Sequence, residues 1–357
     1  MKKIYFALAT LMTAMTVGCN KNVQIEEINR VEDSVLSFTI GEAPVTKATT
    51  EATTAEETMK HLHVFVFNNE TTSAAYKQLE AYAYYTPNAT SQSGSITVSR
   101  GQKKVVFTAN MPASFASGIR TIDDYNAVAW TFASNATSRD AFVMRAVADV
   151  NVDATDKNLG SITMKRIVSR VQVKEVKNSL PLSYGAITLN GIYLHNVTRT
   201  LGNTSWAAAS YWRSGPSSTR SADIATVNAL VNQGATGSIA NAGSWTEPAA
   251  GYYLYGFPNN APEAGSEMAL DYITKVVVDV TINSVTYYYP LGIKNMGENL
   301  AYLINRIELK RLGSGSPDEY VSTATASFSV TVLDWTDGSI VGSYNSETTP
   351  GSGIFTF

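Results

Sequence analysis

The chain has 357 residues, of which 44% are hydrophobic and 16% charged, so it is long and apolar enough to bury the cores of about two domains. Its 27 Lys and Arg against 30 Asp and Glu give a formal net charge of −3, and no run of sequence is rich in Lys or Arg. A nucleic-acid-binding surface needs such a basic cluster, so DNA and RNA are excluded as expected partners. The recurrence of β-branched and aromatic residues favours an all-β fold.

The N-terminus has the pattern of a bacterial lipoprotein signal peptide over residues 1–18. Lys2 and Lys3 precede an apolar run that extends to about Met15, and small residues lead from it to Cys19. Cys19 is the only cysteine, which excludes an internal disulfide, and its position predicts attachment of lipid such as palmitate after cleavage. The alternative is an ordinary cysteine within a discarded signal peptide.

The next predicted element is a strand with one apolar face at residues 34–40. Leu36, Phe38 and Ile40 alternate there with polar residues, which is the period of a half-buried strand. Residues 46–58 then form a run of Thr, Ala and Glu without periodicity, which predicts a mobile linker. A lone strand is therefore expected to precede the domains on a tether.

Two groups of short strands follow, separated by turn signals, which indicates β-sandwiches rather than βαβ units. The boundary between the two domains is expected near Lys165. The strands of the first domain are predicted at 61–67, 79–85, 95–99, 104–109 and 161–164, and the first of them is expected to be buried on both faces. A turn is predicted at 156–160, before the last strand. Segments 123–133 and 140–148 each fit either a short helix or a strand. The strands of the second domain are predicted at 167–173, 186–194, 252–257, 275–283, 285–291, 302–309 and 324–333. A long loop is predicted at 198–246, and its Trp206, Tyr211 and Trp212 either offer a contact surface or pack within the loop.

The sequence contains no pattern typical of catalysis. His61 and His63 share one face of a strand, as a metal site would require, but the only other histidine is His195 and no acidic cluster surrounds the pair. The single cysteine lies at the N-terminus, no Gly-x-Ser-x-Gly elbow is present, and the Gly-Ser turn at 313–316 lacks the lysine of a phosphate loop. We therefore expect no enzymatic activity, no metal and no cofactor.

In their order along the chain, these parts resemble the fimbrillins of Bacteroidales, the subunits of the major and minor fimbriae known as type V pili. The resemblance covers nearly the whole chain. The segments that carry it are the lipoprotein start and residues 64–68, 105–112, 166–171 and 327–335. Each segment alone is a generic strand with a turn, and their joint order is the informative feature.

The resemblance implies two transthyretin-like β-sandwich domains in tandem and export as a lipoprotein of the outer membrane. It further implies that a trypsin-like protease removes an N-terminal propeptide at the cell surface, so that a groove opens and receives the C-terminal segment of a neighbouring subunit. The implied partners are identical subunits and accessory fimbrial subunits, and the implied role is that of a structural pilin in adhesion and biofilm formation.

Applied to this sequence, the resemblance divides the chain into several parts. The divisions are a signal peptide at 1–18, a propeptide at 19–47 with a plug strand at 34–40, an N-terminal domain at 48–164, and a C-terminal domain at 165–357 whose donor tail is 336–357.

Cleavage of the propeptide is expected after Lys47, before Ala48. Arg30 and Lys60 are the other basic residues considered, but a cut at Arg30 leaves the plug in place and Lys60 abuts the first domain strand. Where this chain has Lys47 the fimbrillins usually have arginine, which leaves the identity of the protease open.

The plug strand would fill the groove with Leu36, Phe38 and Ile40. The donor tail contains many Gly and Pro residues, which disfavour a central strand of its own domain. Its candidate groove-filling residues are Ile340, Tyr344, Ile354, Phe355 and Phe357. The alternative is a tail that folds back on its own sandwich.

Three classes of function remain open from the sequence. A shaft subunit needs a removable first strand and a donor tail, whereas a tip subunit needs no donor and an anchor subunit need not be cleaved. The third class is a surface glycan-binding lipoprotein that does not polymerise. The presence of both a plug strand and a donor tail favours the shaft.

Overall fold

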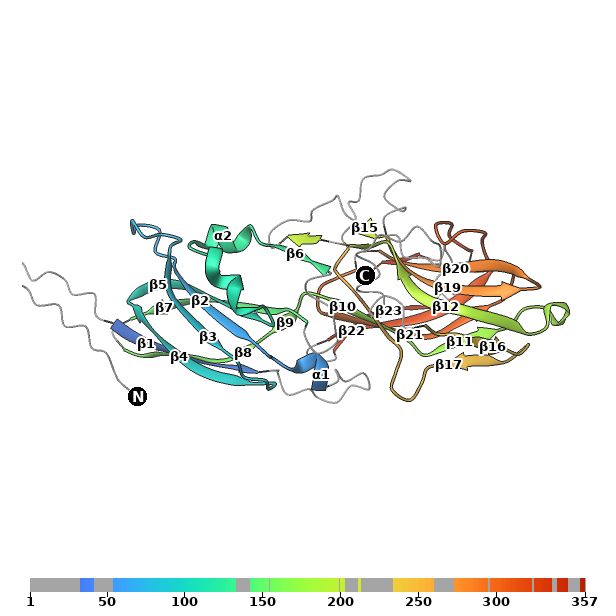
Figure 1. Ribbon diagram of the computed structural model, residues 1–357, viewed down its shortest axis with the longest axis horizontal. Helices are drawn as coiled ribbons and strands as arrows, with labels where there is room; N and C mark the ends of the chain where they lie inside the picture. The colour runs from blue at the N-terminus through green and yellow to red at the C-terminus, as the bar shows by residue number, and fades with distance from the viewer. Residues whose placement is uncertain are drawn as a thin grey trace, which may run out of the picture.

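The computed structural model describes residues 33–41, 54–132, 142–153, 155–198, 200–202, 211–212, 234–259, 273–294, 296–322, 324–335, 339–345 and 354–356. Over these residues the chain is almost entirely β and forms two sandwiches that lie end to end along the long axis (Figure 1). The predicted all-β architecture of two sandwiches is confirmed. In the part of the chain that the structure describes, no helix is long and apolar enough to cross a bilayer.

The N-terminal sandwich packs a small sheet against a larger one. The small sheet has the order β4 (Gln92–Ser99), β1 (Asp33–Gly41) and β8 (Lys157–Thr163). The larger sheet has the order β3 (Leu79–Tyr85), β2 (Leu62–Asn68), β5 (Gly101–Ala109), β7 (Met144–Val152) and β9 (Lys165–Arg166). Apolar side chains from both sheets form one core between them.

Strand β2 is buried on both faces, because two different layers cover it. Val64 and Val66 face the core between the two sheets, and Phe65 and Phe67 face the opposite side. Alternation of side chains along a strand produces this division. The layer over Phe65 and Phe67 consists of η1 (Ala113–Gly118), α2 (Ile122–Asn126) and β6 (Ala129–Thr131), visible above the sheet in Figure 1.

A capping box determines where α2 begins. The Thr121 hydroxyl accepts a hydrogen bond from the Asp124 N–H at 3.0 Å, and the Asp124 carboxylate accepts one from the Thr121 N–H at 2.8 Å. Hydrogen bonds from the backbone of Arg120 and from Thr121 lower the pKa of Asp124. The ambiguous segment 123–133 is thus a short helix followed by a strand, whereas 140–148 leads into β7.

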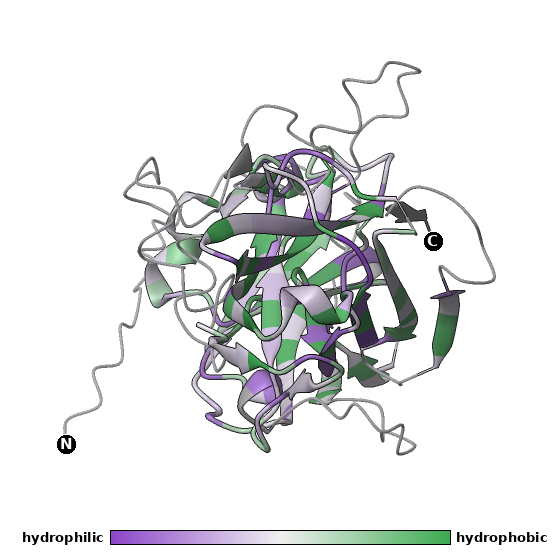
Figure 2. Ribbon diagram, turned by 90° about the vertical axis from the view of Figure 1, so that its right-hand side faces the viewer, coloured by the Kyte–Doolittle hydropathy of each residue, from purple (hydrophilic) through white to green (hydrophobic). Residues whose placement is uncertain are grey.

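The C-terminal sandwich is larger. Its first sheet has the order β17 (Ser244–Thr246), β11 (Glu175–Asn178), β21 (Leu300–Leu309), β10 (Ser169–Val173) and β18 (Tyr253–Gly256), and β22 (Ala326–Asp334) and β23 (Ile340–Asn345) extend it beside β21. Its second sheet has the order β16 (Gly237–Ile239), β12 (Ile187–His195), β19 (Thr274–Ile282), β20 (Val285–Lys294) and β24 (Ile354–Thr356). Figure 2, which looks along the long axis onto this end of the molecule, shows hydrophobic and hydrophilic segments alternating along the strands.

Three sequence predictions need correction. The linker predicted at 46–58 ends in α1 (Thr54–Glu57), because the carboxylate of Glu56 pairs with Arg170 and is buried. The predicted loop at 198–246 contains short strands, because isolated pairs of residues find partners on distant segments that no local pattern reveals. These are β14 (Thr200–Gly202), which pairs with β6 of the other domain, β15 (Tyr211–Trp212), which pairs with β13 (Val197–Thr198), and the edge strands β16 and β17. The predicted turn at 156–160 lies largely within β8, where Gly160 adopts a φ of 70° at an irregularity in the pairing with β1. The remaining short element is η2 (Leu182–Tyr184).

Candidate functional site

Strand β1 is the central strand of the small N-terminal sheet. It pairs antiparallel with β4 from Asp33 opposite Ser99 to Ile40 opposite Gln92, and it pairs parallel with β8 on its other side. Within the described residues, β1 alone joins β4 to β8. Removing it would leave two strand edges whose backbone groups have lost their partners.

The buried face of β1 fills the core of the N-terminal sandwich. Leu36, Phe38 and Ile40 are 0%, 2% and 0% exposed. The Phe38 ring makes edge-to-face contacts with Phe107 at 5.2 Å and with Tyr85 at 6.1 Å between ring centroids. The plug residues predicted from the sequence therefore lie together on one face, in contact with both sheets.

Two acidic residues contact the start of β1. The Ser34 hydroxyl donates to the Asp153 carbonyl at 3.2 Å, and the Val35 N–H donates to the Asp156 carboxylate at 2.8 Å. Hydrogen bonds from the Thr155 hydroxyl and N–H lower the pKa of Asp153. Asp153 and Asp156 belong to the loop before β8, and the contact at Val35 uses only its backbone, so any extended strand could reproduce it.

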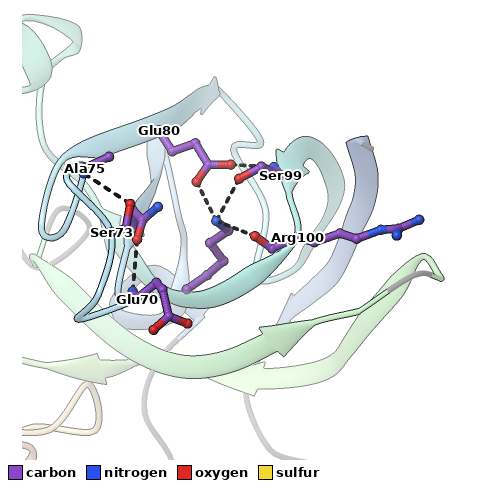
Figure 3. Close-up of polar contacts among 8 residues, drawn as sticks. Glu70, Ser73, Ala75, Glu80, Ser99 and Arg100 are labelled. Carbon is purple, nitrogen blue, oxygen red and sulfur yellow. Dashed lines mark hydrogen bonds and ion pairs between the residues drawn. The ribbon is translucent and has the colours of Figure 1, made fainter. Parts of the chain in front are cut away.

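A buried lysine fixes the end of β4 that lies beside Asp33. Lys103 on β5 has a fully buried side chain, and its Nζ lies 2.7 Å from a carboxylate oxygen of Glu80. The same Nζ donates to the Ser99 hydroxyl at 2.9 Å and to the Arg100 carbonyl at 3.3 Å. Figure 3 shows Glu80, Ser99 and Arg100 converging on this point. The cluster ties β3, β4 and β5 together without β1, so this end of the groove is held independently of the strand that fills it.

The chain re-enters the folded body at α1, whose Glu56 is buried between the two domains. Its carboxylate pairs with Arg170 at 2.9 Å and accepts a hydrogen bond from the Tyr255 hydroxyl, while its carbonyl accepts from Arg166 Nε at 3.1 Å. Both partners in the ion pair are almost completely buried. The segment between β1 and the first domain is thus attached to the body at Glu56, beyond the predicted cleavage point.

Two of the segments that carry the family resemblance, 166–171 and 327–335, meet at the junction of the two sandwiches. The guanidinium carbons of Arg166 and Arg170 lie 4.6 Å and 5.0 Å from the centre of the Trp335 ring. Tyr255 stacks on the same ring at 6.1 Å. The Arg145 guanidinium pairs with Glu298 at 2.7 Å across the same junction. The motifs at 166–171 and 327–335 therefore serve to join the domains.

The described parts of the donor tail pair with their own domain. Strand β23 lies at the edge of one sheet against β22, and the three residues of β24 lie at the edge of the other sheet against β20. Tyr344 stacks on Phe328 at 5.5 Å, but Ile340 and Val341 are 72% and 53% exposed. The tail is therefore held at two sheet edges, and the described side chains of β23 add little to the core.

Several predicted site residues lie outside the described residues: Cys19, Lys47, Ala48, Phe357 and Trp206. For Ile354, Phe355, Tyr211 and Trp212 only the backbone is described. Lys60 lies two residues before β2, and its N–H donates to the Asn110 side chain at 2.8 Å.

Of the two histidines, His63 lies on β2 and His61 just before it, and both ring nitrogens of His63 already have partners within the protein. The Nε2–H of His63 donates to the Met111 carbonyl at 3.0 Å, and the Tyr82 hydroxyl lies 2.9 Å from Nδ1. Burial lowers the pKa of His63, which keeps the ring neutral. The His61 ring lies 2.6 Å from the Tyr84 hydroxyl. Among the described residues, no group of three or more potential ligands could hold a metal ion.

Residues 34–184 match the family model of the major fimbrial subunit protein (FimA). No curated protein sequence matches the chain. Among solved structures, a fimbrilin (FimA) from Porphyromonas gingivalis is similar with a TM-score of 0.59 and 11% identity, over 86% of this chain and 99% of that one. A proposed cell adhesion protein from Bacteroides eggerthii is similar with a TM-score of 0.59 and 15% identity, over 87% and 98% of the two chains. A proposed cell adhesion protein from Parabacteroides distasonis is similar with a TM-score of 0.58 and 14% identity, over 85% of this chain and 98% of that one.

The fold is thus an all-β pair of sandwiches of the kind seen in the fimbrilin structure, and the N-terminal segment supplies the central strand of one sheet. The resemblance to the fimbrillins is confirmed, directly over the residues that match the major fimbrial subunit family and in fold over most of the chain. That family consists of structural subunits and not of enzymes.

Proposed function

We propose that this chain is the shaft subunit of a cell-surface fimbrium and that it polymerises by exchanging β1 for the C-terminal segment of another copy. The observation that carries the proposal is the position of β1. It is the central strand of its sheet, its apolar face is buried, and residues 42–53 separate it from the rest of the sandwich.

The physical reason for polymerisation is the groove that loss of β1 would open. Three core side chains would leave apolar surface exposed, and β4 and β8 would each lose a row of backbone partners. An extended segment from a second copy satisfies both needs at once by β-strand addition. In the precursor the groove is already filled, so the subunit stays monomeric until the strand is removed.

Cleavage after Lys47 by a trypsin-like protease removes β1 together with the lipid-bearing Cys19, and so releases the subunit from the outer membrane. The new N-terminus at Ala48 is close in sequence to Glu56, whose buried ion pair with Arg170 holds the mature chain at the domain junction. The two domains therefore remain joined after the cut, and the change is confined to the groove.

The donor is the C-terminal tail. Its own attachment in the monomer uses two sheet edges, and the last strand contributes three residue pairs. Releasing β23 exposes little core, because Ile340 and Val341 are already exposed, whereas inserting the tail in the groove of another copy buries apolar side chains. Identical subunits and accessory fimbrial subunits would then form the fibre through which the cell adheres and builds biofilm.

Deletion of residues 351–357 tests this function. We expect a secreted, correctly cleaved and stable monomer that forms no multimers, because the sandwich does not need these residues. Unboiled surface extract on a gel reports the multimers, and N-terminal sequencing reports the cleavage. Wild-type levels of multimers from the truncated chain would exclude the tail as donor, and degradation before export would place the tail in its own core.

A further inference from the structure

The groove is not uniform along its length, because both of its edges are altered at the position of Phe38. On one side, Phe38 lies directly opposite Gly94 of β4. On the other side, the pairing with β8 shifts between Ser37 and Thr39, and Gly160 adopts a φ of 70° at this irregularity. Glycine therefore leaves room for the Phe38 ring on the β4 side, while the pairing on the β8 side is irregular at the same position.

The Phe38 ring occupies the space that the missing side chain of Gly94 leaves open. A Cβ atom added to Gly94 would lie 2.7 Å from Cζ of Phe38 and 2.6 Å from the hydroxyl oxygen of Tyr85. Such contacts do not occur without a shift, so any residue other than glycine would narrow the site. Phe107 and Tyr85 line the space with edge-to-face contacts to the Phe38 ring. We call this set of Gly94, Tyr85 and Phe107 the aromatic slot.

We infer that the aromatic slot selects the incoming strand, and that it takes Phe355 from a second copy of this chain. The inference rests on the proposed strand exchange and adds to it the residue that is recognised and the register. A ring at this position gains two aromatic contacts that an aliphatic side chain cannot make. The other plug positions, Leu36 and Ile40, lie opposite Ile96 and Gln92 and require no ring.

The tail sequence favours Phe355 over Tyr344. The plug strand carries its ring between two apolar residues at spacing two, Leu36 and Ile40. Around Tyr344 the residues at this spacing are Gly342 and Ser346, so a strand centred there would bring no second apolar side chain. Phe355 has Phe357 two residues later on the same strand face, and its backbone already adopts an extended conformation in β24.

The test uses full-length chain cut by trypsin-like protease and labelled synthetic peptides that correspond to residues 346–357. The four peptides are the natural sequence, Phe355→Tyr, Phe355→Leu and, as the matched control on the opposite strand face, Ile354→Leu. We expect the Phe355→Leu peptide to bind about tenfold more weakly than the natural peptide, because it loses both ring contacts. The Phe355→Tyr and Ile354→Leu peptides should bind within about threefold of the natural sequence.

Equal binding of all four peptides would overturn the inference about the slot and leave strand exchange standing. A loss at Ile354→Leu as large as that at Phe355→Leu would assign the opposite strand face to the groove and also overturn it. Failure of every peptide to bind the cut chain would instead contradict the proposed function itself.

The variant Gly94→Ala checks the slot from the groove side. Its added methyl group fills the slot, so it should weaken binding of the natural peptide several-fold and reduce the difference between the natural and Phe355→Leu peptides. The outward-facing neighbour Ser95→Ala serves as the control and should keep the full difference. An unchanged preference for Phe355 in Gly94→Ala would show that the ring is not recognised at this position.

Discussion

The stability of the precursor should depend on Phe38 far more than on its sequence neighbour. Phe38 is 2% exposed and contacts two rings, whereas Thr39 is an exposed residue on the opposite face of the same strand. Truncating a buried Phe to Ala costs about 3–5 kcal/mol, while an exposed substitution away from special features stays within about 0.5 kcal/mol. The matched pair is therefore Phe38→Ala against Thr39→Ala.

Urea unfolding of the uncleaved chain measures the difference in the free energy of unfolding between Phe38→Ala and Thr39→Ala. Hydrogen exchange at the β4 and β8 amides shows which strands are destabilised. If β1 detaches as a unit, the decrease in the free energy of unfolding cannot exceed the free energy with which β1 is bound to the sandwich. Hydrogen exchange should then accelerate at the amides of β4 and β8, while the amides of β2 and β5 stay protected. Changing Leu36, Phe38 and Ile40 together to Ser should reach that limit and give premature multimers. Equal stability of Phe38→Ala and wild type would refute the reasoning, since β1 would then contribute nothing to the sandwich.

Three further predictions concern the junction, the cleavage point and pH. Glu56→Gln leaves Arg170 buried without its counter-charge and should cost about 3–5 kcal/mol in urea unfolding, with Glu57→Gln nearly unchanged as its control. Edman sequencing of assembled fibres should begin at Ala48, and Lys47→Ala should block assembly; a start at Val31 would contradict the proposed maturation. Because burial lowers the pKa of His63 from 6.5, the unfolded chain binds the proton first and stability falls as the pH drops below that value. His63→Gln should reduce the decrease in the free energy of unfolding between about pH 7 and about pH 5. An identical decrease in the wild-type and His63→Gln proteins would exclude His63 as its source.

Much of the fold follows from local pattern. The alternation of Leu36, Phe38 and Ile40 predicts both a strand and its buried face, and the apolar run at 61–67 predicts a strand covered on two sides. Periodicity describes one segment at a time, however, so it cannot predict pairings such as that between β6 and β14 of different domains. It also cannot predict that Glu56, in a polar linker, reaches Arg170 more than a hundred residues later.

The site was accessible from sequence only in part. The plug strand can be predicted from sequence because its buried face requires apolar residues. The aromatic slot cannot, because it depends on Gly94, whose role is determined by the side chains that pack against it in the fold. From sequence alone, Gly94 is a glycine that weakens a Ser-rich strand. The structure shows that the rings of Phe38 and Tyr85 lie where a side chain at this position would be. The attachment of the tail at two sheet edges cannot be predicted from the sequence, because edge pairing requires few apolar residues.

The central claim is that the tail of one copy replaces β1 of another, and engineered cysteines test it most directly. One tagged population carries Ser93→Cys or Ser95→Cys on the exposed face of β4, opposite Thr39 and Ser37, and a second population carries Thr356→Cys. Cysteines at facing positions of neighbouring strands come close enough to form a disulfide, and cleavage at Lys47 removes the native Cys19. Strand exchange predicts a disulfide-linked pair of chains that contains both tags and forms only after cleavage. The Ser93→Cys variant should form it if the tail runs in the same direction as β1, and the Ser95→Cys variant should form it if the tail runs in the opposite direction. Cleaved subunits that assemble without either cross-link would contradict strand exchange.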